Sequence, residues 1–321
     1  MPFLENVARG RGIPRERLET VAAHYMRFAG RSPINDESRK LVAALTEELA
    51  RRGPALPVYW GNRNWTPLLA DTVRRMQRDG IRRAVAIATS AFSSYSACRQ
   101  YLEDIARARA EVGDDAPIIE KIPPYWSHPS FLKTMIGHTH EALAELERSA
   151  GAPTRSPVRS TRLVFTAHSI PVAMAESCDY ADELREASSI VAAGAAPGMA
   201  WDLAWQSRSG PPSVPWLEPD ILDHLHALAR GGTSEVVVVP IGFVADHMEV
   251  VFDLDVQAKE LAGSLGMGFV RARCAGASPT FVAGLRDLVA DRVADRVPET
   301  MSARTWRTPC TQGCCTDTPR R

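Results

Sequence analysis

Short runs of apolar residues, many of them β-branched, alternate along the chain with longer stretches whose apolar positions recur at helical spacing. Short apolar runs are typical of buried strands, whereas a spacing of three or four residues indicates an amphipathic helix. Alternation of the two is typical of parallel sheets covered by helices. We therefore predict an α/β fold. Its expected strands cover residues 56–61, 84–89, 117–122, 161–167, 199–206, 234–241 and 268–273.

The amphipathic stretches predict helices between these strands, and two more before the first strand. Pro67 stands where one helix should start and Gly80 where it should end, which is the usual asymmetry of helix termini. The other expected helices cover residues 15–29, 37–51, 181–193 and 219–229.

The chain is expected to form two domains. Residues 151–160 combine Gly, Pro, Ser and Arg without periodicity, which predicts a linker. An N-terminal α/β domain would then cover residues 1–150 and a C-terminal α/β domain residues 161–297, followed by a cysteine-containing tail at 298–321. The first domain has three expected strands and the second has four. We therefore expect that the first strand of the N-terminal domain is missing from this chain.

Composition and charge narrow the classes of function. The chain is 45% hydrophobic and 24% charged, as in an average soluble protein. Its 38 basic and 38 acidic residues cancel, which disfavours binding to nucleic acid. The sequence shows no transmembrane segment and no signal peptide, so we expect a cytoplasmic protein. In that compartment the six cysteines would be thiols or metal ligands before disulfides.

Polar side chains follow two of the strands in the second half. His168 directly follows the strand at 161–167. The strand at 234–241 is followed by Asp246, His247, Glu249 and Asp253. If residue 245 begins a helix, the three carboxylates share one face. These residues could have a purely structural explanation. The histidine would then be hydrogen-bonded to backbone carbonyls, and the carboxylates would form a solvated acidic helix face. Alternatively, the residues could collect a divalent cation, because imidazole and carboxylate suit iron or zinc.

Sequence motifs for several other activities are missing. The chain contains no G-x-G-x-x-G after a strand, no G-x-x-x-x-G-K-[ST] and no G-x-S-x-G. Dinucleotide, P-loop and α/β-hydrolase functions therefore lose their main support, and we expect no nucleotide cofactor.

The strand-end motifs and their neighbours resemble those of ferrochelatases, the enzymes that insert ferrous iron into a porphyrin. The closest similarity is to the actinobacterial coproporphyrin III branch of the family. The segments that carry the resemblance are HY at 24–25, SPIN at 32–35, YWGNRNW at 59–65, FTAHSIP at 165–171, WQSRSGP at 205–211, WLEP at 216–219 and PIGFVADHME at 240–249.

The resemblance implies two Rossmann-like, chelatase-type domains whose parallel sheets face a porphyrin cleft. His168 and Glu249 would be the catalytic pair, binding the Fe²⁺ substrate and taking protons from the pyrrole nitrogens. The side chains that extend from this pair as a second shell or metal path would be Asp246, His247 and Asp253. Family members often have an acidic residue four positions beyond this aspartate, where the present chain has Gln257. The residues implied in porphyrin binding are Arg9, Tyr25, Ser32, Tyr101 and Trp205.

Some actinobacterial relatives carry a 2Fe-2S cluster on one internal and three C-terminal cysteines. The resemblance assigns Cys98 as the internal ligand and Cys310, Cys314 and Cys315 as the C-terminal set. Zinc binding, or plain thiols on the tail, are the alternatives.

The implied activity is that of a metal chelatase, a lyase of haem biosynthesis whose substrates are coproporphyrin III and ferrous iron. Insertion into protoporphyrin IX, a chelatase for another metal, and a non-catalytic tetrapyrrole or haem-binding protein are the alternatives. The resemblance also allows transient contact with neighbouring enzymes of the haem pathway.

Overall fold

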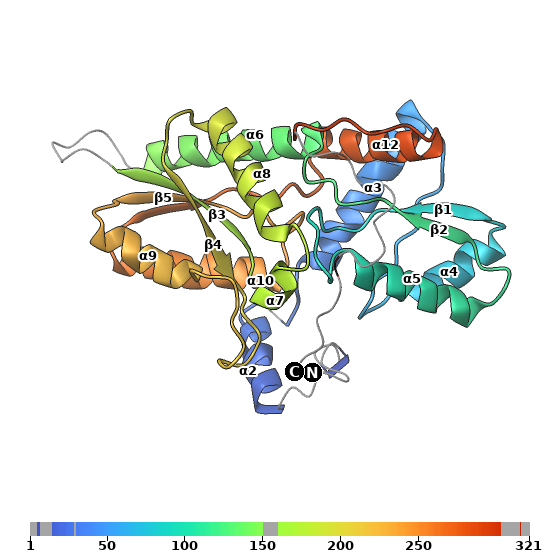
Figure 1. The fold of residues 1–321 in the computed structure, drawn as a ribbon, viewed down its shortest axis with the longest axis horizontal. Helices are drawn as coiled ribbons and strands as arrows, with labels where there is room; N and C mark the ends of the chain where they lie inside the picture. The colour runs from blue at the N-terminus through green and yellow to red at the C-terminus, as the bar shows by residue number, and fades with distance from the viewer. Residues whose placement is uncertain (1–4, 7–14, 29, 150–159, 303–314, 316–321) are drawn as a thin grey trace.

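The computed structural model describes residues 5–6, 15–28, 30–149, 160–302 and 315. Within these residues it contains two parallel sheets (Figure 1). The first pairs β1 (Arg83–Ala86) with β2 (Ile118–Lys121). The second has the order β4-β3-β5-β6, built from β3 (Thr161–His168), β4 (Trp201–Gln206), β5 (Glu235–Val239) and β6 (Gly268–Arg271). The α/β fold with parallel sheets is therefore confirmed.

Helices connect these strands, as the sequence pattern predicts. In the first half they are α2 (Arg15–Met26), α3 (Ile34–Arg52), α4 (Leu69–Arg78), α5 (Arg99–Val112) and α6 (Pro129–Ser149). In the second half they are α7 (Val172–Ala175), α8 (Tyr180–Ala195), α9 (Ile221–Arg230), α10 (Met248–Val250), the π-helix η1 (Val251–Ala258), α11 (Lys259–Ser264) and α12 (Pro279–Val293). No helix in the described part of the chain is long and apolar enough to cross a membrane.

The structure confirms every predicted strand except the first. Residues 56–61 form no ladder, and the described residues nearby contribute only an isolated bridge between Asn62 and Leu68. A strand requires a partner for its backbone groups, and β1 pairs with β2 alone. The prediction of a strand at 56–61 is therefore wrong for this structure.

The second sheet is buried on both faces because successive side chains alternate across it. Leu163 and Phe165 join the core cluster formed with α6 and α8. Val164 and Val238 point the other way, into a cluster with α9, η1 and α11. Continuous apolar strands are typical of parallel sheets covered on both sides.

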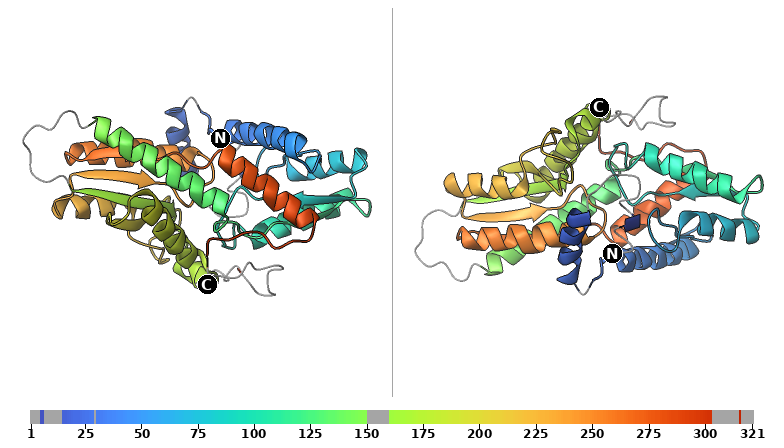
Figure 2. Two further views of the ribbon diagram at one scale, coloured as in Figure 1. Left: turned by 90° about the horizontal axis from the view of Figure 1, so that it is seen from above. Right: turned by 90° about the horizontal axis from the view of Figure 1, so that it is seen from below.

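One apolar core joins the two sheets, because helices cross from each half to the other. Helix α6 packs against α8 and β6, and α12 packs back on α3, α6 and β1 (Figures 1 and 2). Their buried side chains belong to one cluster that includes Leu41, Phe131, Leu163 and Leu285. The predicted linker lies outside the described residues, and a division into domains at 151–160 stays a prediction.

Strand register brings the predicted functional segments to one edge. His168 is the register partner of Gln206 on β4, and Phe165 that of Val239 on β5. The chain leaving β5 crosses the end of β3 at Gly242, whose N–H donates to the Thr166 carbonyl at 3.0 Å. A Cβ on Gly242 would lie 2.5 Å from that of Ala167, so only glycine permits this approach. The segment after β5 therefore passes directly beside His168.

Candidate active site

His168 is held in one orientation at the end of β3. Its Nδ1 contacts the Ser169 carbonyl, and the Tyr180 hydroxyl donates to the His168 carbonyl at 3.0 Å. Because a carbonyl can only accept, Nδ1 donates this hydrogen bond, and Nε2 is the ring nitrogen left to face the site. The side chain is 30% exposed, so Nε2 is available to a ligand.

Glu249 faces this nitrogen. One of its carboxylate oxygens, Oε2, lies 3.6 Å from Nε2 of His168 and 3.9 Å from Nδ1 of His247. The Glu249 side chain is 52% exposed, so the pair opens to solvent. An imidazole nitrogen and a carboxylate on opposite sides of a gap form an arrangement that can share a cation or pass a proton.

His247 caps the short helix that carries Glu249. Its Nδ1 accepts from the Glu249 N–H at 3.2 Å, while its ring lies edge-on to Phe243 with centroids 5.1 Å apart. Burial lowers the pKa of His247. The ring is therefore neutral near pH 7 and acts as a helix cap beside the carboxylate.

Asp253 lies in η1 and turns toward the same site. The Ser207 hydroxyl donates to its carboxylate, and Gln206 Nε2 lies 3.4 Å from it and 3.2 Å from the Glu249 carbonyl. Burial, reinforced by the charge of Glu249, raises the pKa of Asp253 to about 6. Asp253 can therefore take up and release a proton near neutral pH.

Asp246 lies apart from this arrangement. Helix α10 begins only at Met248, so the prediction that Asp246 shares a helix face with Glu249 and Asp253 is wrong. The carboxylate of Asp246 accepts from both terminal nitrogens of Arg271, at 3.0 and 3.2 Å. An arginine fork occupies both oxygens of a carboxylate and leaves it little affinity for a metal.

Two predicted porphyrin-binding residues lie on the other side of Glu249. Ser32 Oγ accepts from the Met248 N–H at 3.2 Å, which joins the start of α3 to the acidic segment. Tyr25, on α2, interacts electrostatically with Glu249. Burial first, and then that charge, raise the Tyr25 pKa to about 12. The phenol therefore stays protonated at neutral pH and can act as a hydrogen-bond donor.

A comparison with protein families assigns the chain. The family model described as Ferrochelatase matches residues 1–293. The chain belongs to the ferrochelatase family. It is 53% identical over 293 residues to a protein named coproporphyrin III ferrochelatase from Mycolicibacterium smegmatis, which covers 90% of this chain and 84% of that one.

Other relatives agree with this assignment. A protein named ferrochelatase from Rhodopirellula baltica is 48% identical over 324 residues, covering 100% of this chain and 90% of its own length. The solved structure of SirB from Bacillus subtilis with Fe³⁺ matches with a TM-score of 0.51 and 12% identity, covering 80% of this chain and 90% of that one. This structural likeness confirms a chelatase fold.

Two further residues predicted to bind porphyrin in this ferrochelatase are described by the structure. Tyr101 is at the start of α5, with the Arg63 guanidinium 4.2 Å from its ring centroid. Trp205 is only 3% exposed and packs on Tyr180 with ring centroids 5.8 Å apart. It therefore supports the histidine from within the core. Arg9 lies outside the described residues.

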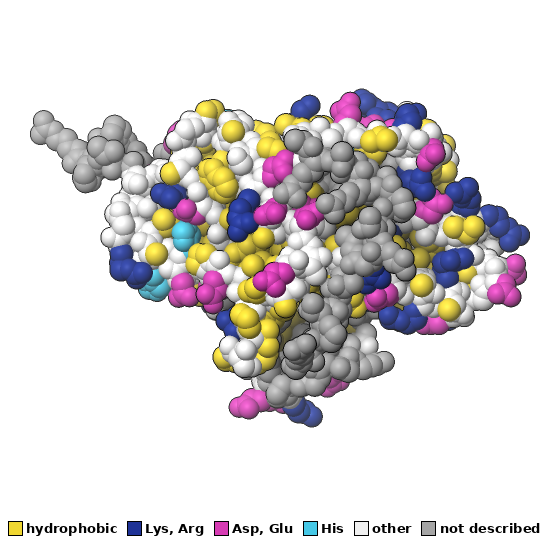
Figure 3. Space-filling model, in the orientation of Figure 1, with side chains coloured by type: hydrophobic (Ala, Val, Ile, Leu, Met, Phe, Trp, Pro, Cys, Tyr) yellow, Lys and Arg dark blue, Asp and Glu magenta, His cyan; other side chains and the backbone are white. Residues whose placement is uncertain are grey.

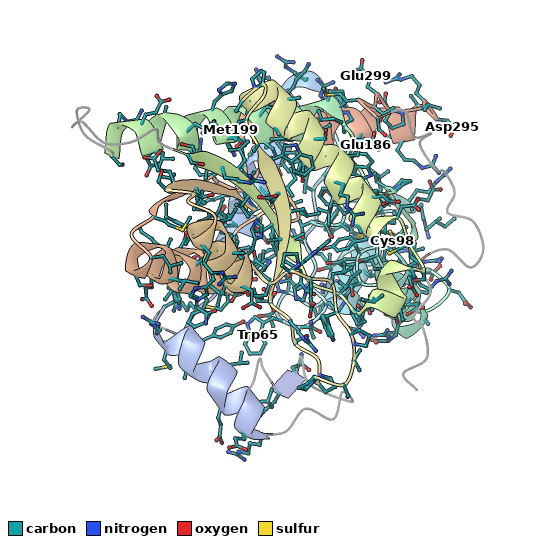
Figure 4. The ribbon with its side chains drawn as sticks, turned by 60° about the vertical axis from the view of Figure 1, so that its left-hand side comes forward. Trp65, Cys98, Glu186, Met199, Asp295 and Glu299 are labelled. Carbon is teal, nitrogen blue, oxygen red and sulfur yellow. The ribbon has the colours of Figure 1, made fainter. Side chains whose placement is uncertain are left out.

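The predicted cluster cysteines of this ferrochelatase are only partly described. Cys98, labelled in Figure 4, occupies the N-cap position of α5. Its thiol hydrogen-bonds with the buried Cys315. This contact lowers the pKa of Cys98 to about 6. Cys310 and Cys314 lie outside the described residues. Within the described chain, no group of three or more His, Cys, Asp or Glu side chains is placed to hold a metal ion.

Sequence reasoning missed several residues that shape the site. Gln206 and Ser207 hold Asp253, Tyr180 holds the backbone of His168, and Arg63 stacks on Tyr101. Gln206 and Ser207 had a detectable signal, since Gln206 is the last residue of the predicted strand at 199–206 and Ser207 follows it. Arg63 lies within the segment at 59–65 that resembles the family, but its stacking on Tyr101 joins it to a distant helix. Tyr180 had no signal, because nothing in the pattern indicates that its hydroxyl reaches the His168 carbonyl.

Proposed function

We propose that this ferrochelatase inserts Fe²⁺ into coproporphyrin III to give Fe-coproporphyrin III. The observation that carries the proposal is the pair formed by His168 and Glu249, 3.6 Å apart and open to solvent. Relatives about half identical to this chain, including those from Mycolicibacterium smegmatis and Nocardia farcinica, are named coproporphyrin III ferrochelatases.

The chemistry requires both a ligand and a base. A free porphyrin carries two N–H groups directed inward, so insertion of Fe²⁺ releases two protons. The Nε2 lone pair of His168 and the carboxylate of Glu249 can accept these protons or hold the cation on the same side of the macrocycle. In this proposal Asp253, whose pKa is about 6, takes protons onward from Glu249.

Iron delivery would use the same carboxylates. His247 Nδ1 lies 3.9 Å from a Glu249 carboxylate oxygen, and Asp253 interacts electrostatically with Glu249. We propose that Asp253 and His247 line the path of the cation, with Asp246 acting only through Arg271. Each of these groups would hold iron weakly, as a metal that must leave for the porphyrin requires.

Basic and hydroxyl residues expected to face the porphyrin fit the tetracarboxylate substrate. Tyr25, Ser32 and Tyr101 are the hydroxyl groups expected to face the porphyrin, and Arg9 and Arg31 are cations in the same part of the sequence. Coproporphyrin III carries two more propionates than protoporphyrin IX, which these donors and cations would favour. On the face in Figure 3, acidic and basic side chains are interspersed, without a basic surface suited to nucleic acid.

The thiol pair of Cys98 and Cys315 fits a further proposal, a 2Fe-2S cluster held by Cys98, Cys310, Cys314 and Cys315. Thiolates are the ligands of such clusters, and the lowered pKa of Cys98 provides one at neutral pH. When bound, the cluster would supply a redox-active link between the tail and α5.

The cluster can be tested in protein purified anaerobically. The wild-type protein should show charge-transfer absorption together with bound iron and sulfide, and Cys98→Ser should lose the absorption, the iron and the sulfide. Iron and sulfide at background level in the wild-type protein would contradict the cluster.

We further propose that the enzyme works in the cytoplasm and contacts neighbouring haem-pathway enzymes transiently. The cysteines that the structure describes are all free thiols, which fits a reducing compartment. Cell fractionation should recover the insertion activity in the cytoplasmic fraction; activity confined to membranes would contradict this location.

The substitution His168→Ala tests the proposed mechanism. We expect anaerobic Fe²⁺ insertion into coproporphyrin III to fall at least about 100-fold, because the ligand and proton acceptor are lost. Porphyrin binding, followed by fluorescence quenching, should change little. A haem carrier would show porphyrin binding without iron-dependent loss of the free-porphyrin spectrum. Near-normal turnover of His168→Ala would overturn the mechanism.

A further inference from the structure

Arg271 is the last residue of β6 and the register partner of Val238 on β5. Its side chain is 12% exposed, and its guanidinium forms bidentate hydrogen bonds with two carboxylates. Nε and one terminal nitrogen donate to Asp255 at 2.6 and 2.8 Å. The two terminal nitrogens donate to Asp246 at 3.0 and 3.2 Å. All five N–H groups of an arginine can be used in such a fixed fork.

The two carboxylates flank the segment that carries the site. Asp246 precedes α10, and Asp255 lies within η1. Between them are His247, Glu249 and Asp253. One guanidinium therefore fixes both ends of the segment whose middle faces His168.

The segment that carries Glu249 and Asp253 departs from a regular α-helix. Helix α10 has three residues, and it continues directly into the π-helix η1 and then into α11 (Lys259–Ser264). A π-helix lacks the regular hydrogen-bond spacing of an α-helix and is frequent at functional sites, so contacts from outside the helix help to fix its register. Phe252 and Leu254 anchor the segment on its buried face. Arg271 supplies the polar anchors at both ends.

We propose that Arg271 is a positioning residue, which sets the register of residues 246–255 so that Glu249 and Asp253 face His168. The inference rests on the proposed iron insertion for its kinetic consequence. Asp246 and Asp255 then act as anchors for Arg271, while Glu249 and Asp253 contact iron or its protons. Arg271 itself touches neither the porphyrin nor the iron.

The variants Arg271→Lys and Asp255→Asn test this role. Lysine keeps the charge but cannot span two carboxylates, and Asp255→Asn removes the charge of one anchor while Asp246 keeps its own. Both changes should lower kcat for Fe²⁺ insertion into coproporphyrin III by about tenfold or more, since misplaced catalytic groups are costly. KM for the porphyrin should stay within about twofold, and Arg271→Met should be more impaired than Arg271→Lys.

A second readout does not depend on activity. In both variants, backbone amides of residues 247–258 should exchange with solvent about tenfold faster or more, while those of β3 keep their rates. The matched control is Arg162→Lys, because Arg162 forms a comparable fork with Asp202, at 2.5 and 3.0 Å, near the opposite end of β3. It should leave both kcat and exchange at 247–258 unchanged.

The outcomes separate the two proposals. A wild-type enzyme that inserts no iron would contradict the proposed function, and the exchange measurement would still decide the role of Arg271. Wild-type kcat, or wild-type exchange at 247–258, in both Arg271→Lys and Asp255→Asn would overturn the positioning role.

Discussion

At the scale of single residues, environment separates chemically similar groups into different roles. Glu249 is half exposed beside His168, Asp253 is enclosed by Ser207 and Gln206, and Asp246 is held by Arg271. Of these carboxylates, Asp253 has its pKa raised to about 6 by burial. Residue type alone cannot distinguish the three, because burial and partners decide which acid binds a proton at neutral pH.

Replacing Asp253 by asparagine should change how stability depends on pH. The folded pKa of about 6 exceeds the ordinary value of 3.8, so the folded state binds this proton more tightly than the unfolded chain. Its stabilising contribution is complete below about pH 4 and is lost as pH rises through 6. Asp253→Asn cannot ionise, so at pH 7.5 it should be more stable than wild type, by up to about 3 kcal/mol.

Chemical unfolding at pH 4 and pH 7.5 checks this expectation. The two proteins should have similar stability at the lower pH and separate at the higher one. Asp295→Asn is the control, because it makes the same chemical change at a side chain that is 96% exposed. A difference for Asp253→Asn that is the same at both pH values would contradict the burial of this carboxyl.

The sequence predicts some of these residues and misses others for identifiable reasons. His168 and Glu249 could be located because each follows a strand with a strong apolar pattern, at the edge where parallel strands end. Arg271 could not, because its partners come from a loop and a π-helix. Nothing in the sequence around Arg271 distinguishes it from an arginine on the protein surface.

At the scale of elements, a glycine and a π-helix determine where the acidic segment, residues 246–255, lies relative to His168. Gly242 lets the chain after β5 cross the end of β3 against Ala167. Helix α10 then starts at Met248, later than the sequence predicts, because His247 provides the cap. The sequence pattern cannot show this delay, since residues 245–253 fit a regular helix starting at 245 equally well.

Gly242→Ala should disturb both stability and activity. The added Cβ would lie 2.5 Å from the Cβ of Ala167 and 2.8 Å from its Cα, so the backbone must move. We expect a loss of about 1–3 kcal/mol in the free energy of unfolding, and a fall in kcat as Glu249 shifts.

Gly263→Ala provides the matched control in the same half of the molecule. Gly263 lies in α11, and a Cβ there meets nothing within 4 Å. Alanine should stabilise this helix by up to about 1 kcal/mol without changing kcat. If Gly242→Ala proves as stable and active as Gly263→Ala, the close crossing at Ala167 is wrong.

At the scale of the whole molecule, the two sheets share one core. Helix α6 covers the second sheet and α12 returns to the first (Figure 2). The strands were predictable from their apolar runs, but this exchange of helices was not. Amphipathic patterns show that a helix covers a sheet without showing which sheet it covers.

A shared core predicts cooperative unfolding. Calorimetry should show one transition for both sheets. Leu285→Ala should lower its midpoint and cost about 2–5 kcal/mol, because Leu285 is 2% exposed within the joint cluster. Val293→Ala, on the same helix but 57% exposed, should cost less than about 0.5 kcal/mol. Two separate transitions would contradict a continuous core.

The most direct test of the function is anaerobic insertion of Fe²⁺ with coproporphyrin III and protoporphyrin IX side by side. We expect iron-dependent loss of the free coproporphyrin spectrum, with kcat/KM about tenfold or more above that for protoporphyrin IX. No iron-dependent change with either porphyrin, or a preference for protoporphyrin IX, would contradict a coproporphyrin III ferrochelatase.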